Sequence, residues 1–391
     1  MSQNNSRPSA SRSLRHLLCT ATAVAVLVTP SAQGQERAQE ASASIRPGGL
    51  LELDLETGAS VELVAVGGGV VTVRTEIGAD SDPVDVEVTE TSRGVRVSTE
   101  ARNRGRSHRS DVKLTIEVPQ QIDIEIESMG GSLTIDGVDG SIRGETMGGA
   151  LRLRNLRGDL ELSTMGGDIE LVDSEVDGKV STMGGEVLLR DVVGDVVGTS
   201  MGGNVRLVDV TRRDGRSTGD AVIITTMGGR IDVDEAPAGA KLETMGGTVH
   251  VVRAEQYVDA QTMGGDIVVE QVAGWIEATT MGGDIEAHVA EGGYDDYHVE
   301  LTSMSGEIVV TLPAGVGFTF DVELEYTRNR EGQYRIDSDF PLEMDESDEW
   351  SSSRGRGDTP RKVITGRGQV GDGAHLVELR TINGNVTIRR Q

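Results

Sequence analysis

The sequence predicts an all-β protein built as a single-stranded parallel β-solenoid, with about 18 residues in each coil. The tripeptide Met-Gly-Gly occurs nine times, and seven of the eight intervals between its copies are 18 residues long. The remaining interval, from Met201 to Met227, is 26 residues long. Apolar and polar residues alternate on both sides of each copy, as they do in strands with one buried face. A fixed period of this length is typical of repeats that stack and share a continuous core.

Residues 1–34 have the features of a signal peptide. A basic region precedes an apolar run from Leu17 to Thr29, which is too short to span a bilayer. Small residues at Ala32 and Gly34 predict cleavage near Gly34, and an uncleaved anchor is the alternative. We therefore expect an exported protein that is periplasmic, displayed on the cell surface or secreted.

Cleavage would leave a mature chain without cysteine. Cys19 is the only cysteine and lies inside the signal, so neither disulfides nor thiol chemistry are expected in the exported protein. No later segment is long and apolar enough to span a membrane. Residues 35–48 are polar and predict a flexible lead-in.

Residues 49–127 predict an irregular N-terminal β-strand region that leads into the solenoid. Alternating segments are Leu51–Leu55, Val61–Val64, Val71–Arg74, Val84–Val88, Val95–Val97, Val112–Ile116 and Ile122–Ile126.

The regular solenoid is expected over residues 128–310. The fourth and sixth residues after each methionine are Leu, Ile, Val or Ala in all nine copies, and the residue before it is always Ser or Thr. Counted from the methionine, the inward positions are therefore odd-numbered before it and even-numbered after it. Because a strand changes face only through a bend or a bulge, the two glycines mark a corner. A second corner is expected near a later glycine, with the apolar residue two before it in the core; these pairs are Val138 and Gly140, Leu156 and Gly158, Val192 and Gly194, and Val272 and Gly274.

The methionines of these structural repeat corners are candidate site residues because they recur in register. They are Met129, Met147, Met165, Met183, Met201, Met227, Met245, Met263 and Met281. Two weaker copies follow, Ser303-Met304-Ser305-Gly306 and Thr381-Ile382-Asn383-Gly384. We expect the thioethers to turn inward and pack in the core. If the strand instead continues outward through them, they form an exposed apolar stripe suited to a partner.

Two insertions predict surface loops that could contact a partner. One lies between Val210 and Val222, and the other lies between Ala290 and Val299. Their candidate interaction residues are Arg212, Arg213, Arg216, Tyr294, Asp295, Asp296 and His298.

Residues 311–391 predict a C-terminal β cap. Eight of the ten aromatic residues lie between Tyr294 and Trp350, where bulky side chains can close the open end of a solenoid. Residues 343–360 are acidic and then rich in serine, which predicts a mobile loop.

The chain resembles a bacterial putative-adhesin family of unknown function, whose members are exported β-strand-repeat proteins similar to auto-transporter adhesin head domains. The resemblance is carried by coils such as Thr164-Met165-Gly166-Gly167-Asp168-Ile169-Glu170-Leu171, by the Leu312-Pro313 turn and by the closing segment from Leu379 to Val386. It implies a repeat fold over nearly all of the mature chain and carries no established catalytic residues. The near-invariant methionine is a departure from the family pattern.

Composition and motifs limit the classes of function. A formal net charge of -27 disfavours nucleic acid, whose phosphates need Lys and Arg partners. Carboxylates after Met-Gly-Gly, such as Asp266 and Asp284, could line up around calcium, but the sequence lacks the Gly-Gly-x-Gly-x-Asp pattern of calcium-binding rolls. No cofactor and no metal site is expected.

These observations favour an exported, non-enzymatic β-solenoid that serves as an adhesion or interaction scaffold in the bacterial cell envelope, with an envelope protein or a glycan as its partner. A carbohydrate-active enzyme, a polysaccharide lyase or hydrolase, is the alternative. Its site would lie near residues 284–300, where the candidates are His288, Tyr294, Asp295, Asp296 and His298, which could also coordinate a metal. A periplasmic sensory or stress-response module is a third hypothesis.

Overall fold

The computed structural model describes residues 37–79, 81–102, 111–211, 222–292, 296–351 and 359–391. These residues form 32 β-strands and one short 3-10 helix, Arg328–Arg330, which confirms the predicted all-β class. The expected signal peptide lies outside the described residues, as do Arg212, Arg213, Arg216, Tyr294 and Asp295. Within the described ranges, no helix combines the length and apolar character of a membrane span.

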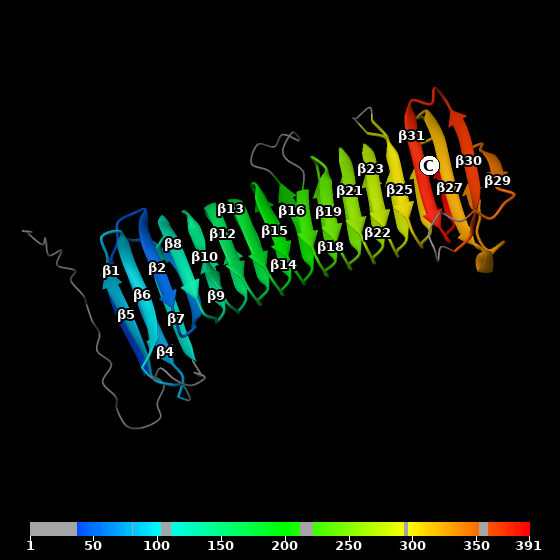
Figure 1. Ribbon diagram of the computed structural model, residues 1–391. Coiled ribbons are helices and arrows are strands. Elements are labelled where there is room, and N and C mark those ends of the chain that lie inside the picture. The colour runs from blue at the N-terminus through cyan, green and yellow to red at the C-terminus, as the bar shows by residue number, and fades with distance from the viewer. Residues whose placement is uncertain (1–36, 80, 103–110, 212–221, 293–295, 352–358) are drawn as a thin grey trace, which may run out of the picture.

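The strands lie side by side across an elongated rod, with the N-terminal strands at one end and the C-terminal strands at the other (Figure 1). Each repeat contributes one strand to each of two facing parallel sheets. The strands before Met-Gly-Gly form what we name the entry sheet, and the strands after it form the exit sheet.

The repeat strands of the entry sheet are β8 (Ile122–Ser128), β10 (Ile142–Thr146), β12 (Arg157–Thr164), β15 (Val196–Ser200), β17 (Val222–Thr226), β19 (Ala240–Thr244), β21 (Tyr257–Thr262), β23 (Trp275–Thr280) and β25 (Val299–Ser303). Those of the exit sheet are β9 (Leu133–Asp136), β11 (Leu151–Arg154), β14 (Val187–Val193), β16 (Val205–Thr211), β18 (Ile231–Ala236), β20 (Val249–Ala254), β22 (Ile267–Val272), β24 (Ile285–Val289) and β26 (Ile308–Leu312). Strand β13 (Ile169–Thr182) runs through the second corner and belongs to both sheets.

Equivalent residues of neighbouring coils pair in parallel register. Leu151 pairs with Ile169, which pairs in turn with Val187. The register survives the 26-residue interval, because Val205 pairs with Ile231 across it. The longer interval therefore does not displace the coils that flank it.

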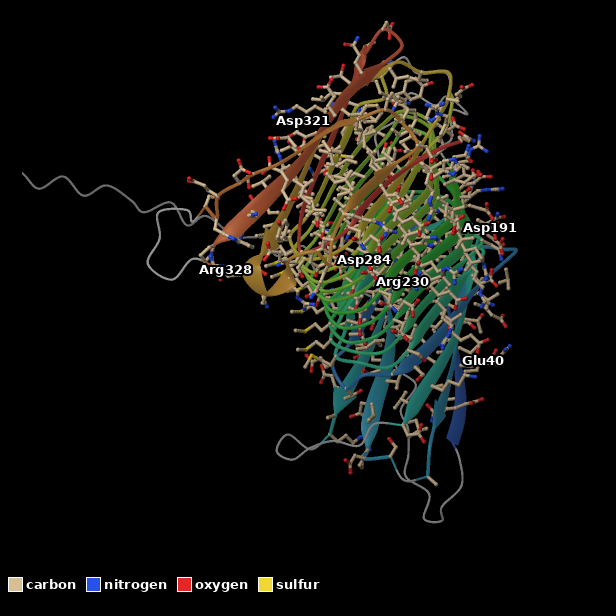
Figure 2. The ribbon with its side chains drawn as sticks, turned by 90° about the vertical axis from the view of Figure 1, so that its right-hand side faces the viewer. Glu40, Asp191, Arg230, Asp284, Asp321 and Arg328 are labelled. Carbon is tan, nitrogen blue, oxygen red and sulfur yellow. The ribbon has the colours of Figure 1, made fainter. Side chains whose placement is uncertain are left out.

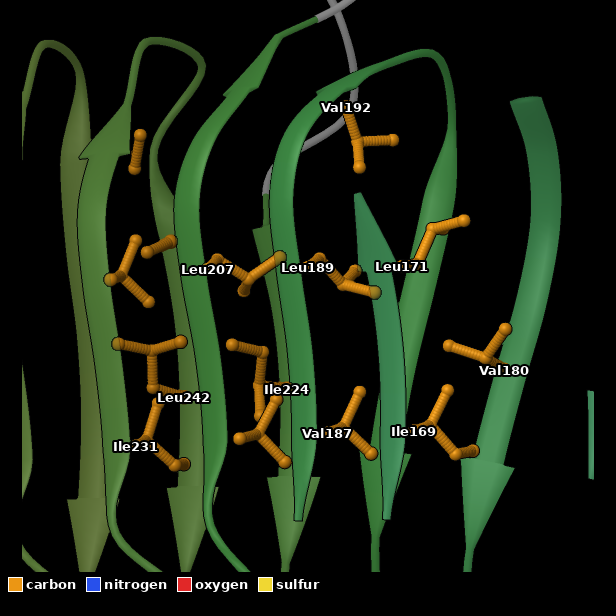
Figure 3. Close-up of a cluster of buried hydrophobic side chains, with 14 of the residues drawn as sticks. Ile169, Leu171, Val180, Val187, Leu189, Val192, Leu207, Ile224, Ile231 and Leu242 are labelled. Carbon is orange, nitrogen blue, oxygen red and sulfur yellow. The ribbon is translucent and has the colours of Figure 1, made fainter. Parts of the chain in front are cut away.

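The space between the sheets is filled by the inward positions that the alternation predicted. The fourth and sixth residues after every Met-Gly-Gly methionine are at most 5% exposed. Figure 3 shows like side chains in rows across coils, such as Leu171, Leu189 and Leu207. Val138, Leu156, Val192 and Val272 are fully buried at the second corner, as expected. Burying a side chain of this size contributes roughly 1.5–3 kcal/mol, and the stack repeats that gain in every coil.

The N-terminal region extends both sheets and ends them with antiparallel strands. Strand β2 (Gly49–Leu55) pairs with β8 and strand β3 (Ser60–Val66) pairs with β9, which adds one further coil. Outside that coil, β6 (Gly94–Ala101) and then antiparallel β5 (Val84–Glu90) close the entry sheet. On the exit sheet, β7 (Val112–Pro119) is followed by antiparallel β4 (Val70–Ile77) and then by β1 (Arg37–Ser44).

The flexible lead-in expected over residues 35–48 is wrong for Arg37–Ser44, which form β1 and pair with β4 along their whole length. The segment is rich in alanine and polar residues, so its alternation carries little hydrophobic signal. Its order comes from the ladder of hydrogen bonds that an open sheet edge offers.

The C-terminal cap continues the sheets in the same way. The last coil, β31 (His375–Ile382) and β32 (Val386–Arg390), stacks directly on β25 and β26. Outside it, β27 (Phe318–Thr327), β30 (Arg361–Val370) and β29 (Glu343–Glu346) extend the entry sheet, while β28 (Ile336–Ser338) covers the exit sheet. Phe318, Phe320 and Phe340 are buried here, in line with the expected aromatic cap.

The mobile loop expected over residues 343–360 is wrong at its beginning, because Glu343–Glu346 form the outermost strand of the entry sheet. The carboxylates of β29 remain exposed, so the strand is charged without being a loop. Charges on an edge strand hinder further strand addition, which gives this composition a structural reason.

Candidate binding groove along the methionine edge

The corner methionines lie on the outside of the rod, so the expected core packing of the thioethers is wrong. The nine Met-Gly-Gly methionines are 46–59% exposed, and Met304 is 45% exposed. The hydroxyl residue before each methionine takes the inner position, and strand alternation then carries the next side chain outward. Figure 2 shows the sulfur atoms, in yellow, gathered along one edge of the ribbon. We name this row, from Met129 to Met304, the methionine edge.

The hydroxyl before the methionine joins two coils. Thr182 Oγ1 donates to the carbonyl oxygen of Gly167 in the preceding coil (2.9 Å) and accepts from the amide of Gly185 in its own corner (3.1 Å). The same pair of hydrogen bonds recurs at Thr164, Ser200, Thr226, Thr244, Thr262 and Thr280. These buried hydroxyls form the ladder that keeps the corner tight, and they hold the methionine outside it.

The second glycine of the tripeptide is required by close stacking, and the first is not. A Cβ on Gly185 would lie 2.1 Å from the carbonyl oxygen of Gly167, whereas a Cβ on Gly184 would meet nothing nearer than 3.7 Å. The two weaker copies agree, because Ser305 and Asn383 replace the first glycine while the second is kept.

Ten methionines occupy consecutive rungs of the edge. The amide of Met183 donates to the carbonyl of Thr164 in the preceding coil, and the amide of Met304 donates to that of Thr280. Across the 26-residue interval, the amide of Met227 donates directly to the carbonyl of Met201. Neighbouring rungs of such a ladder are about 4.8 Å apart.

A groove of about 630 Å³ follows the edge from Met147 to Met227. The methionines line one side of it. Small hydroxyl residues of the entry sheet line the other side, at Ser163, Ser181, Thr199 and Thr225, with Glu145 at one end. In the coils next to its two ends, the equivalent position is filled by the larger Glu127 and Glu243, which explains why the hollow stops.

The acidic residues that follow Met-Gly-Gly have a structural role. Asp266 Oδ1 accepts the backbone amide of Asp284 in the next coil (2.9 Å), and Asp284 Oδ1 accepts that of Glu307 (2.7 Å). Asp168 and Asn204 make the same contact with the coils that follow them. In the described part of the chain, no three His, Cys, Asp or Glu side chains converge as a metal-binding group.

The described residues of the second insertion region are divided between the two sheets. Asp296 is exposed and accepts the amide of His298 (3.2 Å), and His298 Nε2 lies 3.8 Å from the carboxylate of Glu300. His298 immediately precedes β25 of the entry sheet, whereas His288 lies on β24 of the exit sheet. Tyr297, next to His298, is buried, and its hydroxyl donates to the carbonyl of Gly292 (3.1 Å). Tyr297 therefore anchors this corner.

An aromatic ladder at the second corner was not anticipated. The rings of Tyr257 and Trp275 stack with centroids 4.6 Å apart and planes 4° from parallel. Gly239 of the preceding coil leaves room for Tyr257, since a Cβ there would lie 2.3 Å from that ring. The sequence signal for this stack is that Tyr257 and Trp275 occupy equivalent positions in neighbouring coils. It becomes visible once the coils are aligned.

Comparison with known proteins places the chain among β-repeat proteins. A family model described as Toastrack DUF4097 matches residues 52–339, which is well over half of the chain. This confirms the expected relation to a strand-repeat family of unknown function. No curated protein matches the chain.

Solved structures with a similar arrangement include three bacterial proteins. A putative cell adhesion protein from Clostridium sporogenes is 8% identical with a TM-score of 0.18, covering 91% of this chain and 100% of its own. A putative adhesin from Parabacteroides merdae is 10% identical with a TM-score of 0.30, covering 70% of this chain and 93% of its own. A putative adhesin from Parabacteroides distasonis is 8% identical with a TM-score of 0.24, covering 92% of this chain and 98% of its own.

Proposed function

The chain belongs to the Toastrack DUF4097 family, and we propose that it is an exported, non-enzymatic scaffold that binds a protein partner of the cell envelope along its methionine edge. The observation that carries the proposal is the continuous row of ten half-exposed methionines beside a groove. Isolated apolar side chains are normal on protein surfaces, but a contiguous row marks an interaction site.

The chemistry of the groove favours a protein over a glycan. Methionine side chains are flexible and polarizable, so they adapt to apolar side chains of different shapes. Sugar rings are commonly held on exposed aromatic faces, and the groove is lined by methionine, serine, threonine and one glutamate. The stacked Tyr257 and Trp275 present their faces to each other. An extended protein segment with apolar side chains would bury thioethers on one side and meet hydroxyls on the other.

Site-directed crosslinking tests the proposal. In a chain whose only cysteine is removed by Cys19→Ser, a photo-crosslinker is attached through Thr199→Cys in the groove. Arg152→Cys, exposed on the opposite sheet, is the matched control. We expect a discrete protein adduct in envelope preparations from the groove position and none from Arg152→Cys.

Two sets of substitutions show whether the thioether row makes the contact. Changing Met165, Met183 and Met201 to glutamate places carboxylates on an apolar contact and should abolish the adduct, because burying unpaired charge is costly. Changing the same three residues to leucine keeps the apolar surface and should preserve it. Equal crosslinking from both cysteine positions, an adduct that survives the glutamates, or an adduct made of polysaccharide would contradict the proposal.

A further inference from the structure

The methionine edge keeps one residue type more strictly than the core does. In the nine Met-Gly-Gly coils, the fourth position after the methionine varies among Leu, Ile and Val, and the sixth varies among Ile, Leu, Val and Ala. Both positions are buried, where shape matters most. The exposed corner residue is methionine in all nine coils, and Met304 occupies the same position in the next coil.

Packing does not explain why the exposed residue is methionine. About half of each side chain is in contact with solvent, and the last coil carries Ile382 at the same corner. A general apolar docking surface would accept leucine, isoleucine or valine at these positions, as the core positions do. Beyond its unbranched flexibility, the feature that methionine alone supplies among these residues is its thioether sulfur.

Thioethers are soft, uncharged ligands that select Cu(I) over the harder divalent cations. Metal–sulfur bonds are about 2.3 Å long, so two sulfurs on opposite sides of one ion are about 4.6 Å apart. Successive rungs of the ladder are spaced by about 4.8 Å, so neighbouring methionines can meet at one ion with little adjustment. Three rotatable bonds and a half-exposed position leave the sulfurs free to adjust.

We propose that neighbouring methionines of this edge chelate Cu(I), each ion being held by two or three thioethers of consecutive coils. The ligands are neutral, so each bound ion adds one positive charge to a chain whose formal net charge is -27. A strongly acidic protein attracts cations to its surface, which favours loading. Thioethers carry no proton that competes with the metal, so binding should stay constant from about pH 5 to 8, unlike binding by imidazole or thiolate.

Two variants with equal numbers of thioethers test whether adjacent rungs cooperate. Each changes six edge methionines to leucine. The block variant keeps the four consecutive rungs Met165, Met183, Met201 and Met227. The dispersed variant keeps Met129, Met183, Met245 and Met304, which are three rungs or about 14 Å apart, too far for two side chains to share an ion. Met344→Leu is the control, because Met344 is exposed but lies on β29, away from the edge.

The measurement uses Cu(I) alone under anaerobic conditions, in competition with a chromogenic Cu(I) chelator, and Ag(I) as a redox-stable probe of the same softness. We expect about three to five ions per wild-type chain, from ten thioethers shared two or three to an ion. The block variant should hold about two ions with unchanged affinity, and the dispersed variant should bind at least tenfold more weakly. Methyl resonances of the edge methionines should shift on Ag(I) addition, while that of Met344 stays in place.

The proposal is overturned if the block and dispersed variants bind Cu(I) alike, if binding disappears at pH 5, or if Met344→Leu loses as much metal as either variant. It is independent of the proposed protein partner. The dispersed variant removes neighbouring sulfurs but keeps the apolar surface, so it should still form the crosslinked adduct while its affinity for Cu(I) falls.

Discussion

Within the Met-Gly-Gly corner, the residues are subject to different physical constraints. The preceding hydroxyl is fixed by two hydrogen bonds, as at Thr244, which donates to the carbonyl of Gly229 (3.0 Å) and accepts the amide of Gly247 (3.2 Å). The second glycine is fixed by its approach to the coil below. The first glycine and the methionine face solvent, so neither is required by packing. The conspicuous tripeptide is therefore only partly a structural motif.

A pair of alanine substitutions separates the two glycines. A Cβ at Gly247 would lie 1.9 Å from the carbonyl oxygen of Gly229, so Gly247→Ala should force the coils apart and cost about 1–3 kcal/mol or more. A Cβ at Gly246 would have ordinary contacts at 3.8 Å, so Gly246→Ala should be neutral or stabilising by about 0.4–1 kcal/mol. Urea midpoints of the two variants measure the difference. Equal loss of stability would show that both glycines are needed for the bend.

At the scale of the element, the second corner is built differently from the first. Asn155, Asp173, Asp191 and Asp209 occupy the same place in four successive coils, each with φ between 51° and 53°. Asn and Asp tolerate this left-handed conformation better than other residues with a side chain, and Gly137 fills the position in the coil before. Residues of this kind turn the chain without a fixed motif, which is why the sequence marked this corner less clearly.

The C-terminal cap contains a strand whose stability depends on a buried phenol. Tyr326 on β27 is buried, its hydroxyl donates to the carboxylate of Glu346 on β29, and its ring meets Trp350 edge-on at 5.7 Å. Burial, together with the hydrogen bond to Glu346, raises the pKa of Tyr326 to about 12. This contact ties the outermost strand of the entry sheet to the strands beneath it.

The sign of the resulting pH dependence follows from the direction of the shift. Because the pKa of Tyr326 is higher in the folded protein than its ordinary value of 10, the stabilisation is complete below pH 10 and is lost as the pH rises through about 12. Tyr326→Phe should remove this loss of stability at high pH. In an alkaline titration, it should also remove the phenolate absorbance that appears at the highest pH. It should also cost about 1 kcal/mol at neutral pH through the missing hydrogen bond. Identical alkaline denaturation curves for both proteins would count against this account.

At the scale of the whole molecule, the rod is a series of coils that each pair with the coils before and after. The caps use the same sheets, so the rod is longer than its methionine coils alone: the described strands of the entry sheet extend over about 75 Å at 4.8 Å per strand. The interval of 26 residues shows that coil length can vary if the corners stay in register. Antiparallel strands close both sheets at the N-terminal end and the entry sheet at the C-terminal end, whereas the exit sheet ends there on the short parallel strand β28.

Removing one whole coil should therefore leave the fold intact. Deletion of residues 246–263 joins Met245 to Gly264 and restores the Met-Gly-Gly sequence with one coil fewer. Because stability in stacked repeats is close to a sum of neighbour terms, we expect a folded rod with a modestly lower melting temperature. Deleting one residue more, 246–264, places Ile267 and Val269 at the third and fifth positions after Met245, where the alternation turns them outward, so that control should unfold. Strand content by circular dichroism distinguishes the two, and an unfolded 18-residue deletion would contradict the stacking model.

The sequence by itself determined the fold class, the coil length, the inward positions and the place of the first corner. These features follow from local signals. Apolar residues such as Ile169 and Leu171 alternate with polar ones, and a glycine stands where two backbones touch. Both signals recur in every coil, which makes them unambiguous. The register of the methionines made them candidate site residues, but the alternation allowed them to lie on either side of the corner.

Only the tertiary structure decided that the methionines face outward, that Arg37–Ser44 and Glu343–Glu346 are strands, and that Tyr257 stacks on Trp275. Each of these depends on a neighbour that the local pattern does not contain: a hydroxyl bonded to another coil, an open sheet edge, or a ring one coil away. Local periodicity fixes which side chains alternate. Contacts between coils fix which side of a corner is inside, and they place the methionines, which were expected in the core, on the surface of the protein.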